Sequence, residues 1–176
     1  MAQIIKNTLK YYHTFDPLTK RHYINGYQAV LHCHHYATLY TQLALDAGET
    51  ELLQECARDA FREVLDTYFK DNPDIKTLSE KIDIAVQYYS LMGLGKMKVN
   101  FLGDYSGEVE LLSSHIDSGW LRKWGPYDKP VNYISAGYIE AMFESVLGLP
   151  SGTFCAKEIQ SIVMGSKTSI FKITRR

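Results

Sequence analysis

The sequence predicts an α+β fold, in which N-terminal helices pack with an antiparallel sheet that follows them in the chain. Apolar residues recur at helical spacing in several segments before residue 93, whereas they alternate with polar residues in several short segments after it. Helices and strands grouped in this way are typical of the α+β class. We expect residues 1–176 to form one domain, with a hairpin and helical part over 1–92 and a sheet-rich part over 93–176.

A short hairpin is expected at the N-terminus. Asp16-Pro17 initiates turns, and it is flanked by residues 8–15 and 20–24, which are rich in aromatic and aliphatic side chains. Asn25-Gly26 then closes the hairpin in this interpretation.

Three helices are predicted over 27–47, 51–69 and 77–92. Gly48 stands where a glycine ends a helix, and Thr50 is a suitable N-cap for the second helix. The third helix begins with Thr77-Leu-Ser-Glu80, which matches the capping-box pattern.

The first two strands of the sheet are predicted over 96–102 and 107–112. In the first strand Met97, Val99 and Phe101 alternate with polar residues and are expected to face inward. Residues 113–124 follow as a short helix or an irregular segment, which Gly125-Pro126 ends.

A helix over 134–147 and a β-hairpin complete the prediction. Ile139, Met142 and Phe143 recur at helical spacing, while Glu140 and Glu144 lie on the opposite face. Two alternating runs, 153–163 and 167–174, are separated by a glycine that supplies the turn.

The composition indicates an ordinary soluble protein. The chain is 45% hydrophobic and 22% charged, and its formal net charge of −1 favours neither nucleic acid nor an anionic membrane as a partner. The three cysteines are widely spaced and odd in number, which argues against a disulfide framework. No signal peptide or membrane-spanning run is apparent, so a cytoplasmic location is expected. The 13 tyrosines suit either a lined cavity or a subunit interface.

The last third of the chain resembles a known family. The order Ser-x-Gly, helix, Gly-x-Pro, Cys155-Ala-Lys-Glu158-Ile-Gln-Ser161, Gly165 and Ser169-Ile-Phe171 is similar to the C-terminal half of 4-vinyl-reductase-like domains. These domains occur in bacteriochlorophyll-pathway proteins, in archaeal hydrocarbon-binding proteins and in sensor modules of phenol-responsive regulators. Their fold is similar to that of vesicle-tethering TRAPP subunits. The resemblance covers residues 91–173 and implies a ligand cavity and a homodimer.

The family's structural zinc site is altered in this sequence. Sensor-type members hold zinc with one Glu and three Cys, and the matching positions here are Ser135, Glu158, Ser161 and Ser169. A neutral hydroxyl is a poor zinc ligand, so we expect no zinc there. A hydrogen-bonded cluster around Glu158 would replace the metal, and Glu158→Ala would then destabilise the fold by roughly 1–3 kcal/mol. Convergence of Glu158 and Ser161 requires a bulge, because a regular strand places them on opposite faces.

A different metal site is conceivable on the first helix. His32 and His35 lie three residues apart and share a helix face, a spacing that can chelate zinc or another transition metal. The sequence offers no third ligand at a recognisable spacing. The alternative is that these side chains pack at an interface or line a cavity, and no cofactor is otherwise expected.

The predicted ligand site lies between the helix over 134–147 and the sheet. The resemblance places His115 where sensor members have a tryptophan that holds the ligand's polar end, with the alternative that His115 packs an ordinary turn. Ser114, His115 and Asp117 do not form a catalytic triad, because adjacent side chains point apart. The other candidate lining residues are apolar or aromatic: Trp120, Tyr138, Ile139, Met142, Phe143 and Phe154.

Three classes of function follow from these features. The first is a protein that binds a small apolar or aromatic molecule with a polar group, as a sensor, a carrier or an accessory to an enzyme. The second is a hydrolase or metal-dependent enzyme that uses His32 and His35. The third is a structural interaction protein similar to the TRAPP subunits.

Overall fold

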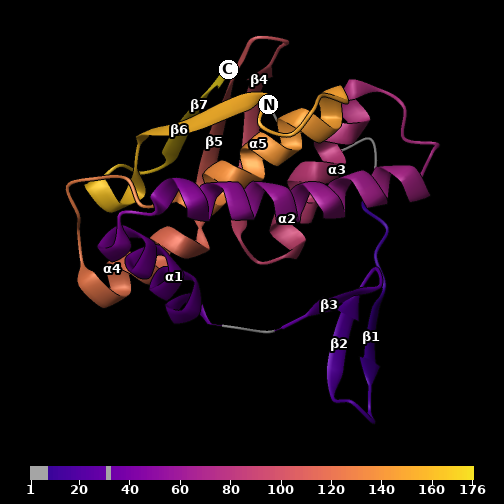
Figure 1. Cartoon of the computed structure of the whole chain (residues 1–176), viewed down its shortest axis with the longest axis horizontal. Coiled ribbons are helices and arrows are strands. Elements are labelled where there is room, and N and C mark those ends of the chain that lie inside the picture. Colours follow the sequence, from indigo (N-terminus) through magenta and orange to yellow (C-terminus); the bar gives the residue numbers. More distant parts are fainter. Residues whose placement is uncertain (1–7, 31–32) are drawn as a thin grey trace.

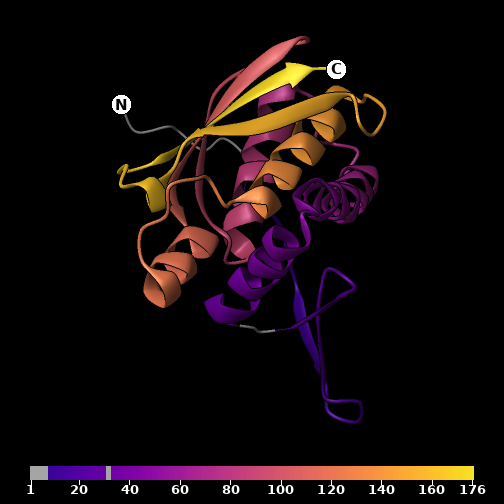
Figure 2. The ribbon, with the colours of Figure 1, turned by 60° about the vertical axis from the view of Figure 1, so that its left-hand side comes forward.

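A four-stranded antiparallel sheet and the helix α5 form the centre of the molecule. A computed structural model describes residues 8–30 and 33–176. The strands are β4 (Gly95–Leu102), β5 (Ser106–Ser114), β6 (Phe154–Gln160) and β7 (Ser169–Arg175), in the order β4-β5-β7-β6. Helices α5 (Tyr133–Leu147) and α3 (Leu78–Leu91) cover the sheet, and α2 (Thr50–Asp71) packs on α5 (Figures 1 and 2). The predicted α+β class is confirmed.

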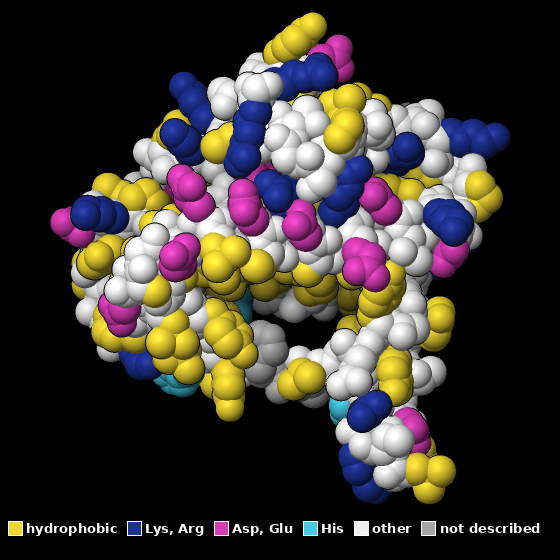
Figure 3. All heavy atoms as spheres, viewed as in Figure 1, with side chains coloured by type: hydrophobic (Ala, Val, Ile, Leu, Met, Phe, Trp, Pro, Cys, Tyr) yellow, Lys and Arg dark blue, Asp and Glu magenta, His cyan; other side chains and the backbone are white. Residues whose placement is uncertain are grey.

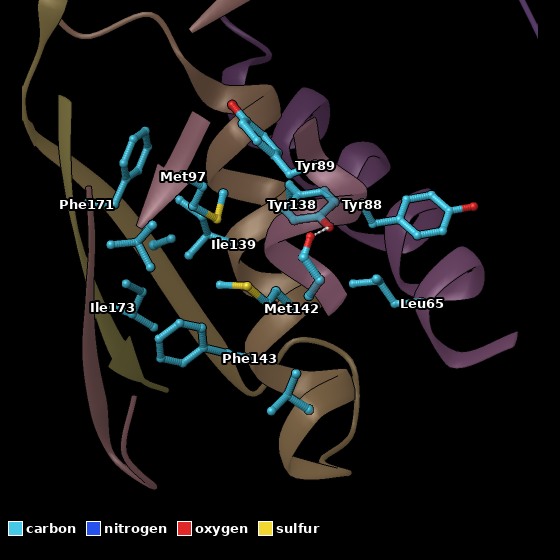
Figure 4. Close-up of a cluster of buried hydrophobic side chains, with 14 of the residues drawn as sticks. Leu65, Tyr88, Tyr89, Met97, Tyr138, Ile139, Met142, Phe143, Phe171 and Ile173 are labelled. Carbon is cyan, nitrogen blue, oxygen red and sulfur yellow. Dashed lines mark hydrogen bonds between the residues drawn. The ribbon is translucent and has the colours of Figure 1, made fainter. Parts of the chain in front are cut away.

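The main core lies between α5 and the sheet. Tyr89, Tyr138, Phe143, Phe154 and Phe171 have no exposed surface, and their side chains interlock with those of α2 and β4 (Figure 4). The Phe143 and Phe154 rings meet edge to face at 5.6 Å, and Tyr89 and Tyr138 meet at 5.0 Å. Such aromatic pairs add stabilisation beyond the area they bury.

Helix α5 is buried on all sides, which the predicted amphipathic pattern did not indicate. Glu140 and Glu144 do lie opposite the apolar face. The face that carries these glutamates packs on α2, however, so neither side chain is exposed. The two helices approach closely at Gly137, where a Cβ atom would collide with the Gln54 carbonyl and the Ala57 side chain. Glycine at this position therefore permits the helix contact.

The two buried glutamates accept hydrogen bonds from backbone amides on the outer edge of β6. Glu144 Oε1 accepts a hydrogen bond from the Phe154 amide at 3.2 Å, and Glu140 Oε1 accepts one from the Ala156 amide at 2.8 Å. Gln54 Nε2 donates to the Ala156 carbonyl at 3.1 Å. Side chains of α5 and α2 thus replace a neighbouring strand and prevent edge-to-edge pairing.

A second, three-stranded sheet extends away from the body (Figure 1). It contains β1 (His13–Asp16), β2 (Arg21–Ile24) and β3 (Tyr27–Ala29). The predicted hairpin is confirmed, but the helix predicted from residue 27 is wrong at its start. Asn25 and Gly26 have φ values of 50° and 83°, which is the geometry of a tight hairpin turn that carries the chain into β3.

The remaining helices differ from prediction mainly at their ends. Helix α1 (His34–Ala47) ends at Gly48, which is left-handed with φ 74°, and α3 begins with the predicted Thr77–Glu80 capping box. Thr50 lies within α2 and is not its cap. Residues 115–124 form the helix α4 (His115–Trp124), and the short 3₁₀ helix η1 (Ile162–Met164) links β6 to β7.

The prediction that the Phe101 side chain faces inward is wrong. Met97 is buried as expected, but Phe101 is 52% exposed. The pairing of β4 with β5 shifts by one residue between Val99 and Phe101. A one-residue bulge transfers the following side chain to the other face of a strand.

No helix among the described residues combines the length and the apolar character needed to cross a bilayer.

Candidate ligand-binding site

The apolar residues predicted to line a cavity lie in the core instead. Tyr138, Ile139, Met142, Phe143 and Phe154 have no exposed surface and belong to one cluster of buried side chains, in which the Tyr138 ring contacts Phe61 of α2 and Tyr89 of α3 (Figure 4). Their own side chains fill the space in which a ligand was predicted. A ligand could contact them only if part of the core moved.

His115 and Trp120 lie apart from this core. Trp120 is 2% exposed and packs in a separate small cluster with Val131 and Val163. His115 is half-buried at the start of α4, and its ring centroid is 6.1 Å from that of His34 on α1. The predicted ligand contacts therefore lie in three different places: the main core, the small cluster around Trp120 and the start of α4.

The four positions that match the family zinc site form a buried polar region. A register shift between Glu158 and Gln160 supplies the bulge that convergence requires, and the Ser161 and Ser169 hydroxyls lie near the Glu158 carboxyl, but Ser161 Oγ makes no hydrogen bond of normal geometry. Ser161 and Ser169 are 1% and 0% exposed. Ser169 Oγ accepts a hydrogen bond from the Ile162 amide at 3.0 Å, and Ser135 Oγ shares one of 2.7 Å with the Tyr89 hydroxyl.

Asn132 connects this region to the start of α4. Its backbone N–H donates to Glu158 Oε2 at 3.2 Å, and its side-chain Nδ2 donates to Ser114 Oγ and Asp117 Oδ2, both at 2.8 Å. Its Oδ1 accepts from the Ser135 amide, so Asn132 also caps α5. We call Ser114, Asp117, Asn132, Ser135, Glu158, Ser161 and Ser169 the polar cluster.

Sequence reasoning missed Asn132 and Asp117 as members of the polar cluster. Asn132 directly precedes the predicted helix, and asparagine is a preferred N-cap, so that signal was available. Nothing local indicates that Asp117, fifteen residues earlier, contacts the Asn132 side chain.

Burial controls the protonation of both acids in the cluster. The pKa of Glu158 is raised to about 7, mainly by burial and also by the neighbouring Asp117, while the nearby Ser169 and Ser161 hydroxyls and the hydrogen bond from the Asn132 amide oppose the rise. Burial also raises the pKa of Asp117, against hydrogen bonds from Ser114 and Asn132. The Glu158 carboxyl can therefore donate or accept a proton near neutral pH.

Three buried polar atoms of the cluster have no hydrogen-bond partner of normal geometry. They are Glu158 Oε1, Asp117 Oδ1 and Ser161 Oγ. Buried polar atoms in folded proteins are normally paired with protein or with water. This part of the molecule thus has spare capacity for hydrogen bonds to a water molecule or to a ligand.

A cleft of about 590 Å³ opens beside the polar cluster, between α2, residues 129–136 and β6. Asn132 and Glu158 contribute to its wall. Its volume lies within the range of small-molecule sites. The other lining residues are Thr50, Glu51, Gln54, Glu55, Lys129, Pro130, Tyr133, Ala136, Cys155, Ala156, Lys157 and Arg176.

Two further clefts lie near the N-terminal segment. One, of about 300 Å³, is lined by five tyrosines between α2 and the β1–β3 sheet, where the surface is hollowed (Figure 3). The other, of about 700 Å³, lies between residues 8–11, α3 and β4. Neither cleft contains a residue of the polar cluster.

The histidines predicted to bind metal are only partly described. His32 lies outside the described residues, and His35 is exposed on α1. Within residues 8–30 and 33–176, no three His, Cys, Asp or Glu side chains are grouped so that they could hold a metal ion.

Solved structures with the same fold are known, although the sequence matches no protein-family model and no curated protein. The phenol-responsive sensory domain of the transcription activator PoxR, solved with phenol, has a TM-score of 0.77 at 11% identity, over 93% of this chain and 84% of that one. A vinyl-4-reductase family protein from Methanocaldococcus jannaschii has a TM-score of 0.56 at 13% identity, over 84% of each chain.

A third structure with a similar fold is a subunit of a trafficking protein particle complex. The trafficking protein particle complex subunit 3 from Naegleria fowleri, covalently bound to palmitic acid, has a TM-score of 0.53 at 14% identity, over 80% of this chain and 90% of that one. The chain thus has the 4-vinyl-reductase-like and TRAPP-like fold. The resemblance predicted from the sequence is confirmed at the level of fold.

Proposed function

We propose that this protein binds a small organic molecule in the cleft beside the polar cluster. The observation that supports the proposal is that Glu158, whose Oε1 has no hydrogen-bond partner of normal geometry, lies in the wall of a cleft of about 590 Å³. Oε1 itself is buried, so a ligand in the cleft reaches it after a small movement of the wall and then gains a hydrogen bond that the free protein lacks.

The lining of the cleft indicates the chemistry of the ligand. Tyr133, Pro130 and Ala136 supply an apolar surface for an aromatic or aliphatic body. Glu158 can accept a hydrogen bond from a ligand hydroxyl or, when protonated, donate one to a carbonyl. Acidic and basic side chains both border the cleft, so it does not favour a strongly charged ligand.

Structures of similar fold support a ligand-binding role. One is a sensory domain solved with phenol and another carries palmitic acid, so this fold accommodates small organic molecules of different shapes. The roles consistent with such binding are sensor, carrier and enzyme accessory.

The site predicted from the sequence is the alternative position for the ligand. It comprises His115, Trp120 and the core residues Tyr138, Ile139, Met142, Phe143 and Phe154. Binding there requires the core to open, whereas the cleft is already open to solvent.

Homodimerisation is a further part of the proposal. Four large side chains on one side of α1, Tyr36, Leu39, Tyr40 and Leu43, are 39–56% exposed, and hydrophobic side chains gather there (Figure 3). An apolar helix face of this kind is suited to a second copy of the chain.

Native mass spectrometry of the purified protein, alone and with phenol, tests the proposal. We expect the folded protein to carry a small organic mass that is lost on denaturation, or to take up one phenol per chain. A polypeptide mass unchanged under both conditions would refute ligand binding. A transition metal at one per chain that is lost in His35→Ala would instead favour the metal-dependent enzyme, and a chain that takes up neither would favour a structural interaction protein.

A further inference from the structure

Two histidines meet on the extended β1–β3 sheet. His13 Nε2 and His22 Nδ1 are 2.8 Å apart on adjacent strands, and the pair is exposed to solvent. The ring planes are within 9° of parallel, and their centroids are 5.0 Å apart. Because the nitrogens are much closer than the centroids, the rings meet edge to edge with one N–H between them.

The 2.8 Å between His13 Nε2 and His22 Nδ1 is close to the distance between two ligand nitrogens on one metal ion. Two imidazole nitrogens bound at about 2.0–2.1 Å with an angle of about 90–109° are roughly 2.9–3.3 Å apart. Rotation of each ring would direct both lone pairs at an ion. His13 is exposed and can rotate freely, whereas His22 is half-buried and its ring centroid lies 4.8 Å from that of Phe15.

The sequence pattern did not reveal this pair, because the two histidines come together only through the pairing of β1 with β2. The strand register places His13, Phe15, His22, Ile24, Tyr27 and Ala29 on one face. The two histidines are nine residues apart in the chain, so only the hairpin pairing brings them together. No carboxylate or thiolate shares that face among the described residues, so water would fill the remaining coordination positions.

We propose that His13 and His22 form a two-histidine site for a divalent transition metal such as Zn²⁺, which clips β1 to β2. The ion replaces the hydrogen bond between the rings. The donor imidazole exchanges its proton with solvent and becomes protonated on its other nitrogen, so the neutral pair releases no net proton. Imidazole is a good ligand for zinc, copper and nickel.

The clip has a mechanical consequence for the extended sheet. Its strands contain four, four and three residues, and sheets this small are marginally stable on their own. A metal that joins β1 to β2 reduces the freedom of the open hairpin. Zn²⁺ therefore orders the β1–β3 sheet relative to the metal-free protein.

Zn²⁺ titration by calorimetry tests the proposal with wild type, His13→Ala, His22→Ala and, as the matched control, His35→Ala. We expect one Zn²⁺ per chain in wild type and His35→Ala, with affinity weakened at least about tenfold in each hairpin variant, since each removes one of two ligands. Hydrogen exchange of the Thr14 and Tyr23 amides, which lie on the paired strands, should slow with Zn²⁺ in wild type but not in His13→Ala.

Several results would overturn the proposal. They are no Zn²⁺ binding by the wild type, binding that either hairpin variant leaves unchanged, or binding that only His35→Ala removes. The last result would assign the metal to α1. Circular dichroism of each variant establishes that the fold is retained, which the exposure of the pair leads us to expect.

Discussion

Glu158 connects the polar cluster to the cleft, and its protonation makes stability depend on pH. Its pKa is raised from 4.5 to about 7 in the folded protein, chiefly by burial. An acid with a raised folded-state pKa contributes stability that is fully present below about pH 4.5. That stability is lost as pH rises through 7. Asp117 acts in the same direction, because burial raises its pKa too.

Glu158→Gln should remove most of this dependence. Glutamine keeps a hydrogen-bond acceptor but cannot ionise. Between pH 5 and pH 8 the wild type should therefore lose roughly 2–3 kcal/mol of unfolding free energy relative to the variant. Urea unfolding at both pH values measures the difference.

Glu55→Gln is the matched control, because Glu55 borders the same cleft but is exposed. It should change the pH dependence by less than about 0.5 kcal/mol. Parallel pH profiles for wild type and Glu158→Gln would show that Glu158 is ionised without cost in the folded protein.

Single residues could be predicted where local geometry was sufficient. Side chains alternate between the two faces of a strand, so Glu158 and Ser161 were predicted to need a bulge to converge. That bulge is present. Asp117 escaped prediction because its contact with Asn132 depends on how α4 and α5 are placed.

At the scale of elements, the edge strand β6 depends on carboxylates from α5. Glu140 accepts hydrogen bonds from the Ala156 amide and from Gln54 Nε2, and it lies 3.7 Å from Arg58 Nη1. Burial raises the pKa of Glu140, while these partners oppose the rise. Removing the carboxylate would leave the Ala156 amide without its acceptor and Arg58 Nη1 without its ion-pair partner, although Arg58 Nε would keep its bond to Asp59.

Glu140→Ala should therefore destabilise the fold by about 3 kcal/mol or more. Urea unfolding gives the free energy, and hydrogen exchange should show faster exchange of the Ala156 amide. Glu63→Ala, at an exposed position of α2, should change stability by no more than about 0.5 kcal/mol. Equal effects of the two substitutions would contradict the role assigned to Glu140.

Elements were predicted well where a local signal determines them. The Thr77–Glu80 capping box and Gly48 gave correct helix ends. Residues 27–29 were assigned to a helix because their pattern continues into α1, yet the turn at Asn25-Gly26 pairs them with β2. Phe101 was misplaced because a bulge in β4 does not appear in an alternating pattern.

At the scale of the whole molecule, the fold was predictable but the position of the cleft was not. The order of motifs in the last third predicted a 4-vinyl-reductase-like fold, which the PoxR sensory domain shares over 93% of this chain. The predicted cavity residues instead fill the core, because periodicity identifies buried side chains without showing whether space remains between them. The cleft arises where α2, β6 and residues 129–136 meet.

The exposed face of α1 predicts the oligomeric state. Leu43 is 55% exposed on that face, and Leu18 is 91% exposed at the turn between β1 and β2. If two copies associate through α1, Leu43→Lys should produce monomers, because a desolvated lysine opposes burial of the face. Leu18→Lys should leave the dimer intact.

Light scattering during size-exclusion chromatography measures both variants. A monomeric wild type would contradict homodimerisation. A dimer broken only by Leu18→Lys would place the interface on the β1–β3 sheet.

The claim that a small molecule binds beside Glu158 is tested most directly by a phenol titration followed by amide NMR at pH 7. It compares wild type, Cys155→Phe and Cys56→Phe. Cys155 lines the cleft, whereas Cys56 is exposed on α2 outside it. We predict shifts at Asn132, Tyr133 and Ala156 in wild type and Cys56→Phe, with at least about tenfold weaker binding in Cys155→Phe, whose ring fills the site. Absence of binding in the wild type, equal binding by all three proteins, or shifts confined to Ile139, Met142 and Phe143 would contradict the claim.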